Sequence, residues 1–564
     1  MLTNHHPVDN HRPPDPPISA HPTHPHLTAE QTPHRMDIVL WLFVVGLVLA
    51  AWAYSRWRHS YWSSLGIPTP PSLPFLGHIH KQLSLTQNRW DYFDEVYYKY
   101  GGATFCGMYE IFRPVLMIGD PDILKNIFVK DFDHFVDRRQ FLAEEGSLTN
   151  EMLGNKSGDE WRALRAVMTP TFTSGKMRGM FPLISDKADD LVSFTLKEAA
   201  KKPYVDMKVN FGRFTMDTIA SCTFGIECNS FKEEEPEFAK WAESFFSFSF
   251  IRTLKFTIIN ISPRLFNFLR LKLETSGTKF FERVVKQTIA VRKRGQRRGD
   301  YLDLLLDAQA SHDQHTTKST SIKSNTTSET SNTDNHSDND SLSVVPSKQV
   351  LTDKSIVAQS VLFLIAGYDT TASTLAFASF LLAKYPVHQQ RLRQELQQMV
   401  QEHGDITYQG IMEAKFLDAC VMETLRLYPP GTFGERVCNK TYKITGTNVV
   451  LRPGDLVTIP IWSLHHDPRY WPEPEVFLPD RFLPENKTNI RSFTHMPFGM
   501  GPRNCIAMRF ALLEAKVALT KLLLKAEIHL RSCHEELKLE PSPFLLRPDG
   551  GVNLVVSPLT AKTN

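Results

Sequence analysis

The run from Val357 to Ala383 constrains the fold of this chain more than any other feature. Asp369 is its only charged residue, so a helix built from it is apolar on nearly every face and must lie in lipid or in a protein core. Polar side chains such as Gln359 would be costly in lipid, and Pro386 ends the run. We therefore expect a long helix buried inside a soluble core. A second membrane span is the alternative.

A second apolar run, from Ile38 to Ser55, lies near the N-terminus and carries no charge. Its length is close to the roughly 17–25 residues that a helix needs to cross a bilayer. Arg56 and Arg58 follow directly, and positive flanks stay in the cytosol. We expect residues 36–58 to form a single-pass membrane anchor that leaves the bulk of the chain cytosolic. A cleaved signal peptide is the alternative, but no small-residue cleavage site precedes the basic flank.

Several segments are too polar or too rich in proline to form a core. Residues 1–35 are rich in His and Pro, and residues 311–343 are mostly Ser, Thr, Asn, Asp, His and Lys, so we expect both to be disordered. Met36 could serve as the translation start, which would make residues 1–35 an extension. The prolines within residues 59–74 predict a stiff hinge between anchor and globule. Residues 556–564 are expected to form a C-terminal tail.

Composition narrows the class of protein. A net charge of +3 gives no reason to expect a nucleic-acid partner. The seven cysteines are odd in number, scattered and free of any CxxC pair, which disfavours a disulfide framework and a structural zinc site and fits a reducing compartment. The pattern from Trp90 to Gln309 is mostly helical, with a short strand expected at Val115 to Ile118.

The chemistry of the chain is concentrated in the run FGMGPRNCIA, residues 498–507. Gly499 and Gly501 permit a tight backbone turn close to a flat ligand. Cys505 precedes an apolar helical run, so it should lie at a helix N-terminus, where the macrodipole and free N–H groups favour the thiolate. A thiolate is a soft ligand for a transition metal. A buried structural cysteine in a glycine turn is the alternative for this run alone.

This run resembles the haem-binding loop of the cytochrome P450 superfamily, Phe-x-x-Gly-x-Arg-x-Cys-x-Gly, with Ala507 in place of the last glycine. The resemblance implies that Cys505 is the axial ligand of the iron of haem b, and that Phe498 and Arg503 also contact the cofactor. A cysteinate ligand pushes electron density to the iron and favours O–O cleavage. We expect Ala507, at a helical position, to tighten the packing over the haem without loss of ligation.

A Glu-x-x-Arg motif at Glu423 and Arg426 lies upstream. The i,i+3 spacing puts both charges on one helix face, where they can pair. With Arg481, the pair resembles the family's buried Glu-Arg-Arg cluster, which locks the core around the haem loop. A solvated surface pair is the alternative without that context.

The run from Ala366 to Thr370, AGYDT, matches the oxygen-activating stretch of the family's central helix. Its glycine and threonine can loosen the helical hydrogen bonds beside the iron, and the Thr370 hydroxyl and Asp369 carboxylate can relay protons to bound dioxygen. We therefore predict Asp369 and Thr370 as catalytic residues. The alternative is a threonine bonded back to its own turn and a solvated aspartate.

Trp161 and Arg165 resemble the family's Trp-x-x-x-Arg motif, which implies that both contact a haem propionate. Indole N–H and guanidinium groups are donors that suit a carboxylate. By the same resemblance, Arg436 and Arg503 are further propionate ligands. Four residues are predicted to line the substrate pocket, although each could be plain core: Ala366, Pro430, Phe433 and Leu545.

The resemblance covers about residues 65–555 and implies one mainly helical domain with a small β-rich lobe, which we place at residues 75–555. The runs TMDTIASCTFGIECNSF and PFGMGPRNCIAMRFAL are similar to the clan that contains animal drug-metabolising family-three enzymes and thromboxane synthase. That similarity implies a monooxygenase in the endoplasmic reticulum membrane.

The resemblance also implies the reaction and the partners. The substrate would be a lipophilic xenobiotic, steroid or fatty-acid type molecule, and the electrons would come from NADPH through a cytochrome reductase, with cytochrome b5 as an optional partner. Two other functions stay open. One is a synthase or isomerase that rearranges oxygen on the same fold and needs no NADPH. The other is a non-catalytic haem sensor or carrier, which would not need the Asp369–Thr370 pair.

Overall fold

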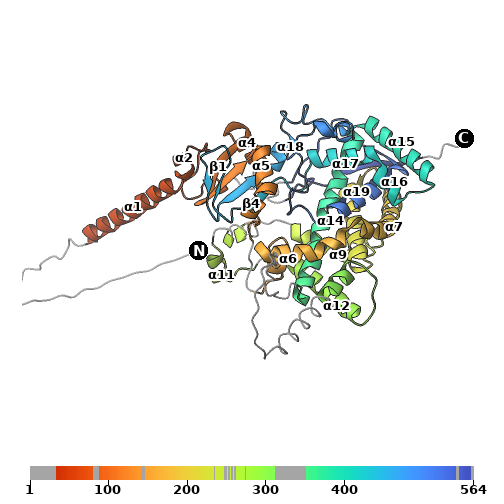
Figure 1. Cartoon of the computed structure of the whole chain (residues 1–564), viewed down its shortest axis with the longest axis horizontal. Coiled ribbons are helices and arrows are strands. Elements are labelled where there is room, and N and C mark those ends of the chain that lie inside the picture. The colour runs from red at the N-terminus through yellow and green to blue at the C-terminus, as the bar shows by residue number, and fades with distance from the viewer. Residues whose placement is uncertain are drawn as a thin grey trace, which may run out of the picture. The chain divides into compact units, whose positions relative to one another are not determined.

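The computed structural model describes residues 33–559 apart from 81–87, 141–145, 234–235, 247–250, 252–253, 256–257, 260–261, 273–274, 311–350 and 541–544 (Figure 1). The chain forms two compact units that meet between Arg56 and Trp57. Disorder was predicted for residues 1–35 and 311–343, of which residues 1–32 and 311–343 fall outside the described residues, whereas residues 33–35 belong to a helix. Helix α1 spans Pro33–Arg58, so it begins three residues before the predicted anchor.

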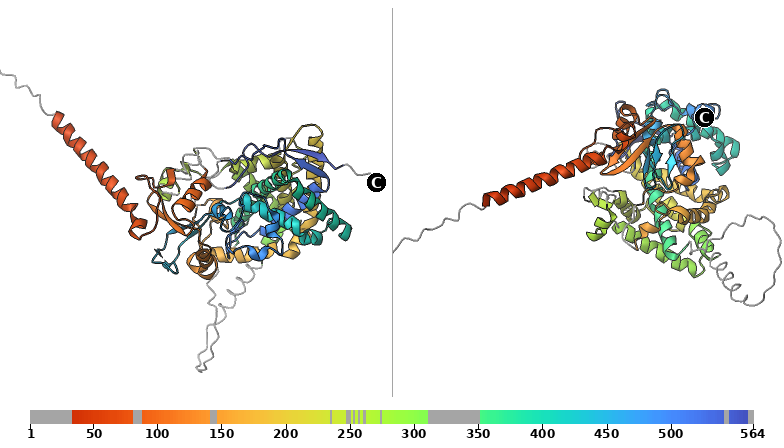
Figure 2. Two further views of the ribbon diagram at one scale, coloured as in Figure 1. Left: turned by 90° about the horizontal axis from the view of Figure 1, so that it is seen from above. Right: turned by 60° about the vertical axis from the view of Figure 1, so that its left-hand side comes forward.

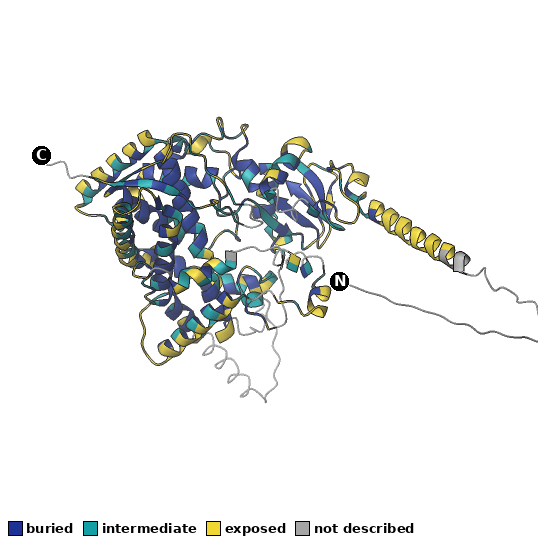
Figure 3. Ribbon diagram, turned by 180° about the vertical axis from the view of Figure 1, so that it is seen from behind, coloured by how far each residue is buried: buried dark blue, intermediate teal, exposed yellow. Residues whose placement is uncertain are grey.

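Helix α1 is apolar around its whole circumference. Its side chains from Ile38 to Leu49 are exposed, with Trp41 at 69% and Phe43 at 63% (Figure 3). The span from Ile38 to Arg58 is long and apolar enough to cross a membrane. A helix without a polar face is stable only where something apolar surrounds it.

Helices make up most of the second unit. They are α2 (Tyr61–Ser64), α4 (Arg89–Lys99), α5 (Pro121–Lys125), α6 (Gly158–Met168), α7 (Ser174–Ala199), α8 (Met207–Ile219), α9 (Glu237–Phe246), α11 (Pro263–Phe268), α12 (Ser276–Lys293), α14 (Asp353–Lys384), α15 (Pro386–His403), α16 (Tyr408–Glu413), α17 (Lys415–Leu427), α18 (Ile461–His465) and α19 (Met508–Leu523). Short 3-10 turns are η2 (Phe132–His134), η3 (Leu148–Glu151), η4 (Thr169–Phe172), η6 (Pro479–Phe482) and η7 (Lys487–Asn489), and π-helical turns are η1 (Asn126–Lys130) and η5 (Ala220–Phe224).

Helix α14 is the central element of this unit. Its N-cap Thr352 accepts a hydrogen bond from the Ser355 N–H, and it ends before Pro386. It packs against α8, α12, α17 and α19, and most of its apolar length is buried (Figure 3). At Gly367 a Cβ would lie 2.6 Å from Ile219 Cδ1, so the glycine permits the close approach of α8. The prediction of a helix buried in a protein core is confirmed.

Strands form a smaller part of the unit, beside the helices (Figure 2). The main sheet has the order β1 (Phe105–Glu110), β2 (Arg113–Ile118), β7 (Leu456–Ile459) and β4 (Gly434–Val437). Among the described strands of this sheet, β2 and β7 pair in parallel and the other neighbours pair antiparallel. The other sheets are β3 (Val205–Asp206), β9 (Asn553–Pro558) and β8 (Ala526–His529), and the pair β5 (Tyr442–Lys443) and β6 (Val450–Leu451). The predicted strand at 115–118 and the mainly helical class are therefore confirmed.

Two predicted boundaries differ from the structure. Within the proposed hinge, residues 59–74, Trp62 is fully buried, and its Nε1 donates to the Met108 carbonyl at 2.9 Å. A Cβ at Gly107 would overlap the Trp62 ring, so the sheet has room for this side chain. Trp62 therefore anchors this segment to the sheet. At the other end, β9 continues to Pro558 by pairing with β8, so the predicted tail begins too early.

Candidate active site

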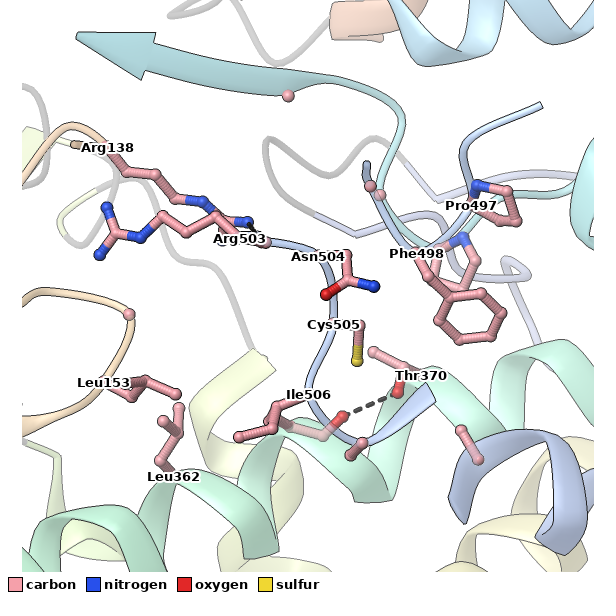
Figure 4. Close-up of a pocket in the computed structure, with 18 of the residues that line it drawn as sticks. Arg138, Leu153, Leu362, Thr370, Pro497, Phe498, Arg503, Asn504, Cys505 and Ile506 are labelled. Atoms are coloured by element: carbon pink, nitrogen blue, oxygen red, sulfur yellow. Dashed lines mark hydrogen bonds between the residues drawn. The ribbon is translucent and has the colours of Figure 1, made fainter. Parts of the chain in front are cut away.

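A cavity of about 710 Å³ brings together most of the predicted site residues. Its walls come from α6, α14, β4, the loop before α19 and the segment before β9 (Figure 4). The predicted residues that line it are Trp161, Arg165, Ala366, Thr370, Pro430, Phe433, Arg436, Phe498, Arg503, Cys505 and Leu545. Those that do not line it are Asp369, Glu423, Arg426 and Arg481.

The loop before α19 presents Cys505 to the cavity. Gly499 and Gly501 have φ of 69° and 71°, and a Cβ at Gly501 would overlap the Phe128 carbonyl, so glycine is required there. The Cys505 N–H donates to the Phe498 carbonyl at 2.8 Å and closes the turn. Ala507 has φ of −93° and is the residue before the helix, not a helical residue as expected. Because this φ is negative, alanine fits there without strain.

The surroundings of the Cys505 thiol act on its charge in opposite directions. Burial raises the pKa of the thiol, whereas the backbone N–H of Ala507 and the guanidinium groups of Arg165 and Arg138 lower it. The net direction is upward, so the helix N-terminus alone does not produce the predicted thiolate. The thiol is nevertheless exposed to the cavity. Coordination to a metal ion would supply the missing stabilisation, because a coordinating thiol is deprotonated.

Arginines gather on the same cavity wall. Arg436 is buried, its Nη1 donates to the Glu435 carbonyl, and its Nε and Nη2 have no hydrogen-bond partner among the described residues. Burial holds the pKa of Arg436 well below its usual range, and the like charges of Arg138 and Arg503 add to this. Burial, followed by the charge of Arg138, lowers the pKa of Arg503 to about 9. An anion in the cavity would relieve this repulsion.

Trp161, Arg165 and Arg138 lie beside Arg503 or its loop. The Arg503 guanidinium lies 4.6 Å from the centre of the Trp161 ring, and Arg165 donates to the Asn504 carbonyl and side-chain oxygens, both at 2.9 Å. Arg138, which donates to the Arg503 carbonyl at 2.7 Å, was not predicted from the sequence (Figure 4). Its only signal is that it stands in an Arg-Arg pair.

The comparison with known families identifies this arrangement of cysteine and arginines. A sequence profile described as "Cytochrome P450" matches residues 67–555. The chain belongs to the cytochrome P450 family. The chain is therefore a monooxygenase of the haem-thiolate type.

Individual P450s from several animals are similar to nearly the whole chain. Cytochrome P450 9e2 of Blattella germanica is 37% identical over 534 residues, which cover 91% of this chain and 96% of that protein. Cytochrome P450 3A41 of Mus musculus is 34% identical over 537 residues, 93% of this chain and 97% of that protein. Cytochrome P450 3A5 of Homo sapiens is 34% identical over 535 residues, 93% and 97% respectively. The resemblance to family-three enzymes is thereby confirmed.

The residues of the cavity fit a haem. No three His, Cys, Asp or Glu side chains within the described part of the chain form a metal-binding group, so a metal at Cys505 must bring most of its ligands with it. A haem does so through its four pyrrole nitrogens and also carries two carboxylates. The partnerless nitrogens of Arg436 and the repelling charges of Arg138 and Arg503 suit such carboxylates.

The three residues predicted as a structural cluster lie together, away from the cavity. Arg426 donates from Nε and Nη2 to the two Glu423 carboxylate oxygens at 2.8 and 2.9 Å, and both side chains are fully buried. Arg481 Nε lies 3.4 Å from Glu423 Oε1. Glu423 Oε1 also accepts the Leu478 N–H, and Arg426 Nη1 donates to the His465 carbonyl. The cluster ties α17 to the end of α18, to η6 and to the residue before η6.

The catalytic pair is arranged differently from the expectation. Thr370 lines the cavity, but its hydroxyl donates to the Ala366 carbonyl at 2.7 Å, and α14 is helical without a break from Asp353 to Lys384. The expected loosening of the helix is therefore absent. The Asp369 carboxylate is neither solvated nor in the cavity: it is 1% exposed and ion-paired with Lys208 and Arg547. It can act on the cavity only when these ion pairs open.

A charged wall of the cavity was also missed by sequence reasoning. Arg139 pairs with Glu110 at 2.7 Å and with Glu435 at 2.8 Å, and Arg89 lies 3.9 Å from the centre of the Phe433 ring. These residues come from α4, β1, the segment after η2 and β4. No local sequence pattern could have joined them, because the fold alone makes them neighbours.

Proposed function

We propose that this P450 inserts one oxygen atom from O2 into a lipophilic small molecule, of xenobiotic, steroid or fatty-acid type, at the endoplasmic reticulum membrane. The observation that carries the proposal is the shared cavity of Cys505 and Thr370. Its wall also includes apolar side chains such as Phe172, Leu362 and Phe363. An apolar pocket with a few polar groups favours a lipophilic ligand.

In this proposal Cys505 would bind the iron of haem b, and Trp161, Arg165, Arg436 and Arg503 would hold its carboxylates, together with Arg138. Phe498, which lines the cavity, is proposed to contact the haem as well. Bound haem supplies oxygen binding and O–O cleavage, which a cysteinate ligand favours. The cluster of Glu423, Arg426 and Arg481 is proposed to keep the loop in place and takes no part in the chemistry.

The chain's own contribution to catalysis is proton delivery and substrate positioning. The overall reaction joins a substrate C–H, O2, two electrons and two protons, and yields an alcohol and one water. We propose that Thr370 releases the Ala366 carbonyl and passes protons from Asp369 into the cavity. Ala366, Pro430, Phe433 and Leu545 are proposed to position the substrate.

The electrons are proposed to come from NADPH through a cytochrome reductase, with cytochrome b5 as an optional partner. Helix α1 is proposed as the single membrane anchor, because Arg56 and Arg58 at its end favour a cytosolic flank. The length and exposed apolar side chains of α1 support this proposal. Resistance of the full chain to alkaline extraction from microsomes would test it, and release into the wash would contradict it.

The test of the proposed activity follows labelled oxygen. The full-length enzyme, reductase and NADPH are incubated with testosterone or lauric acid under ¹⁸O2. We expect one labelled atom in the product, and a loss of product per NADPH of about tenfold or more in Thr370→Ala and Asp369→Asn. Thr288→Ala is the matched control, since Thr288 bonds back to its own helix turn on α12 at 2.9 Å. Unlabelled product, or turnover without NADPH, would contradict the proposal.

A further inference from the structure

Two cations hold the Asp369 carboxylate outside the cavity. Lys208 Nζ, at the start of α8, donates to Asp369 Oδ1 at 2.7 Å, and both side chains are largely buried. Arg547 Nε, in the segment before β9, lies 3.3 Å from Asp369 Oδ2. The ion pair between Arg547 and Asp369 is the weaker of the two, because Arg547 Nη1 also lies 3.3 Å from Glu540 Oε2. Arg547 thus divides its charge between two carboxylates.

Lys208 and Arg547 are both connected to the segment that precedes β9. Asp206 caps α8 by accepting the Lys208 N–H at 2.9 Å, and the same Oδ1 accepts the Val552 N–H at 3.1 Å. The Met207 N–H donates to the Val552 carbonyl at 2.8 Å, and β3 pairs with β9. A displacement of the segment from residue 545 to 552 would therefore move Arg547 directly and Lys208 through Asp206.

That segment also forms part of the cavity wall. Leu545 lines the cavity two residues before Arg547, and the Leu546 N–H donates to the carbonyl of Pro430, which lines the cavity as well. The Glu540 N–H donates to the Arg547 carbonyl at 2.9 Å, so the chain around Glu540 is hydrogen-bonded to the segment that carries Arg547. A molecule that packs against Leu545 pushes on the residues that carry the Asp369 ion pair.

We propose that Arg547 is a positioning residue that keeps Asp369 withdrawn while the cavity lacks substrate, and that a lipophilic substrate packed against Leu545 weakens this hold. Once the Arg547 contact opens, the carboxylate is held from one side only and can turn toward the neighbouring Thr370. Proton delivery is then coupled to the presence of substrate. The inference rests on the proposed relay through Asp369 and Thr370, and it adds the device that controls that relay.

The test compares variants of the full-length, haem-loaded enzyme with reductase. Without added lipophile, Arg547→Met should consume NADPH about tenfold faster than the wild type. Coupling between two sites in a protein typically changes an equilibrium by about 5–150-fold. Added testosterone should stimulate the wild type strongly and Arg547→Met little. Arg547→Lys should restore the wild-type behaviour. Arg531→Met is the control, since Arg531 forms its ion pair with Glu535 and should change neither rate.

Glu540→Gln provides a second variant with the opposite sign. It removes the competitor for Arg547 on a side chain that is 40% exposed, so folding should tolerate it. The hold on Asp369 should tighten, and NADPH consumption should fall below the wild-type rate. Deuterium exchange gives a readout apart from turnover: testosterone should speed exchange of the Leu546 and Val552 amides in the wild type.

The outcomes separate the inference from the function beneath it. Wild-type rates in both Arg547→Met and Glu540→Gln, with Asp369→Asn impaired, would overturn the role of Arg547 and leave the relay standing. Wild-type rates in Asp369→Asn would overturn both. Slower exchange at Leu546 and Val552 on addition of testosterone would contradict the coupling between Leu545 and the ion pair.

Discussion

Two groups of buried arginines in this P450 contrast in how their charges are satisfied. Around Glu423, the Arg426 guanidinium makes two short hydrogen bonds to one carboxylate, and backbone carbonyls accept the rest. In the cavity wall, Arg436 keeps two nitrogens without a partner among the described residues and is repelled by Arg138 and Arg503. The first group is complete in that Arg426 has its counter-charge and its carbonyl acceptors within the protein, while Arg481 Nε, 3.4 Å from Glu423 Oε1, adds an ion pair without a hydrogen bond. The second becomes complete only when an anion enters.

The difference separates scaffold from binding site. A buried ion pair with all its hydrogen bonds made gives a fixed geometry, whereas buried like charges raise the free energy of the folded protein until a ligand balances them. The sequence motifs around Arg426 and Arg503 look equally charged. Only their surroundings distinguish a residue that holds the fold from one that holds a cofactor.

Breaking the complete cluster should have the largest effect. Glu423→Gln leaves Arg426 buried without a counter-charge, which typically costs about 3–5 kcal/mol. We expect a correspondingly lower free energy of unfolding in urea and little haem-loaded protein. Glu535→Gln, which removes the charge that pairs with the exposed Arg531, should cost less than about 1 kcal/mol. Equal losses in the two variants would show that the cluster around Glu423 is not the stabilising unit.

Removing a cation from the cavity wall should affect the haem-free and the haem-loaded protein differently. Arg436→Met relieves repulsion in the haem-free protein, so its free energy of unfolding should not fall. The haem-loaded protein should lose its cofactor faster, by about tenfold, as expected for hydrogen bonds to a charged group. Transfer of haem to apomyoglobin measures this rate. Arg162→Met is the control, because Arg162 is 42% exposed and pairs with Asp133 and Asp159. Unchanged haem loss from Arg436→Met would remove Arg436 from the site.

The histidines near the complete cluster should make its stability depend on pH. Burial lowers the pKa of His495 to about 3 and that of His466 to about 4. As the pH falls below about 6.5, the unfolded chain binds protons that the folded chain does not, so stability falls toward acid. His495→Gln should reduce this slope by about 1.4 kcal/mol per pH unit between pH 6.5 and 5.

Urea titrations at several pH values measure that slope. His529→Gln, at a side chain that is 46% exposed, should leave it unchanged. A slope that is the same in His495→Gln as in the wild type would mean that His495 takes up protons in the folded protein.

Local sequence patterns predicted the helices, turns and strands that depend on the spacing of neighbouring residues. The apolar run around Asp369 gave a buried helix, the glycines at 499 and 501 gave the turn, and the strand at 115–118 was found from its composition. Ten other predicted residues meet Cys505 in one cavity, because the family motifs mark positions that the fold brings together. These features depend on neighbours in the sequence or on a known pattern.

The errors and omissions concern contacts between distant segments. Trp62 lies just before the prolines that predict a spacer, and the space above Gly107 makes it a core residue. Lys208 stands 161 residues before Asp369 and Arg547 even farther after it, so no motif could have indicated these partners. The direction of the Cys505 pKa was also misjudged, because burial depends on the whole cavity.

The measurement that tests the account most directly is the difference spectrum of the dithionite-reduced, full-length protein with and without carbon monoxide, for the wild type and Cys505→Ala. The account predicts a red-shifted Soret band of the thiolate type in the wild type and its loss in the variant. Haem-loaded wild-type protein without such a band, under non-denaturing conditions, would contradict the assignment of Cys505 as the anionic ligand.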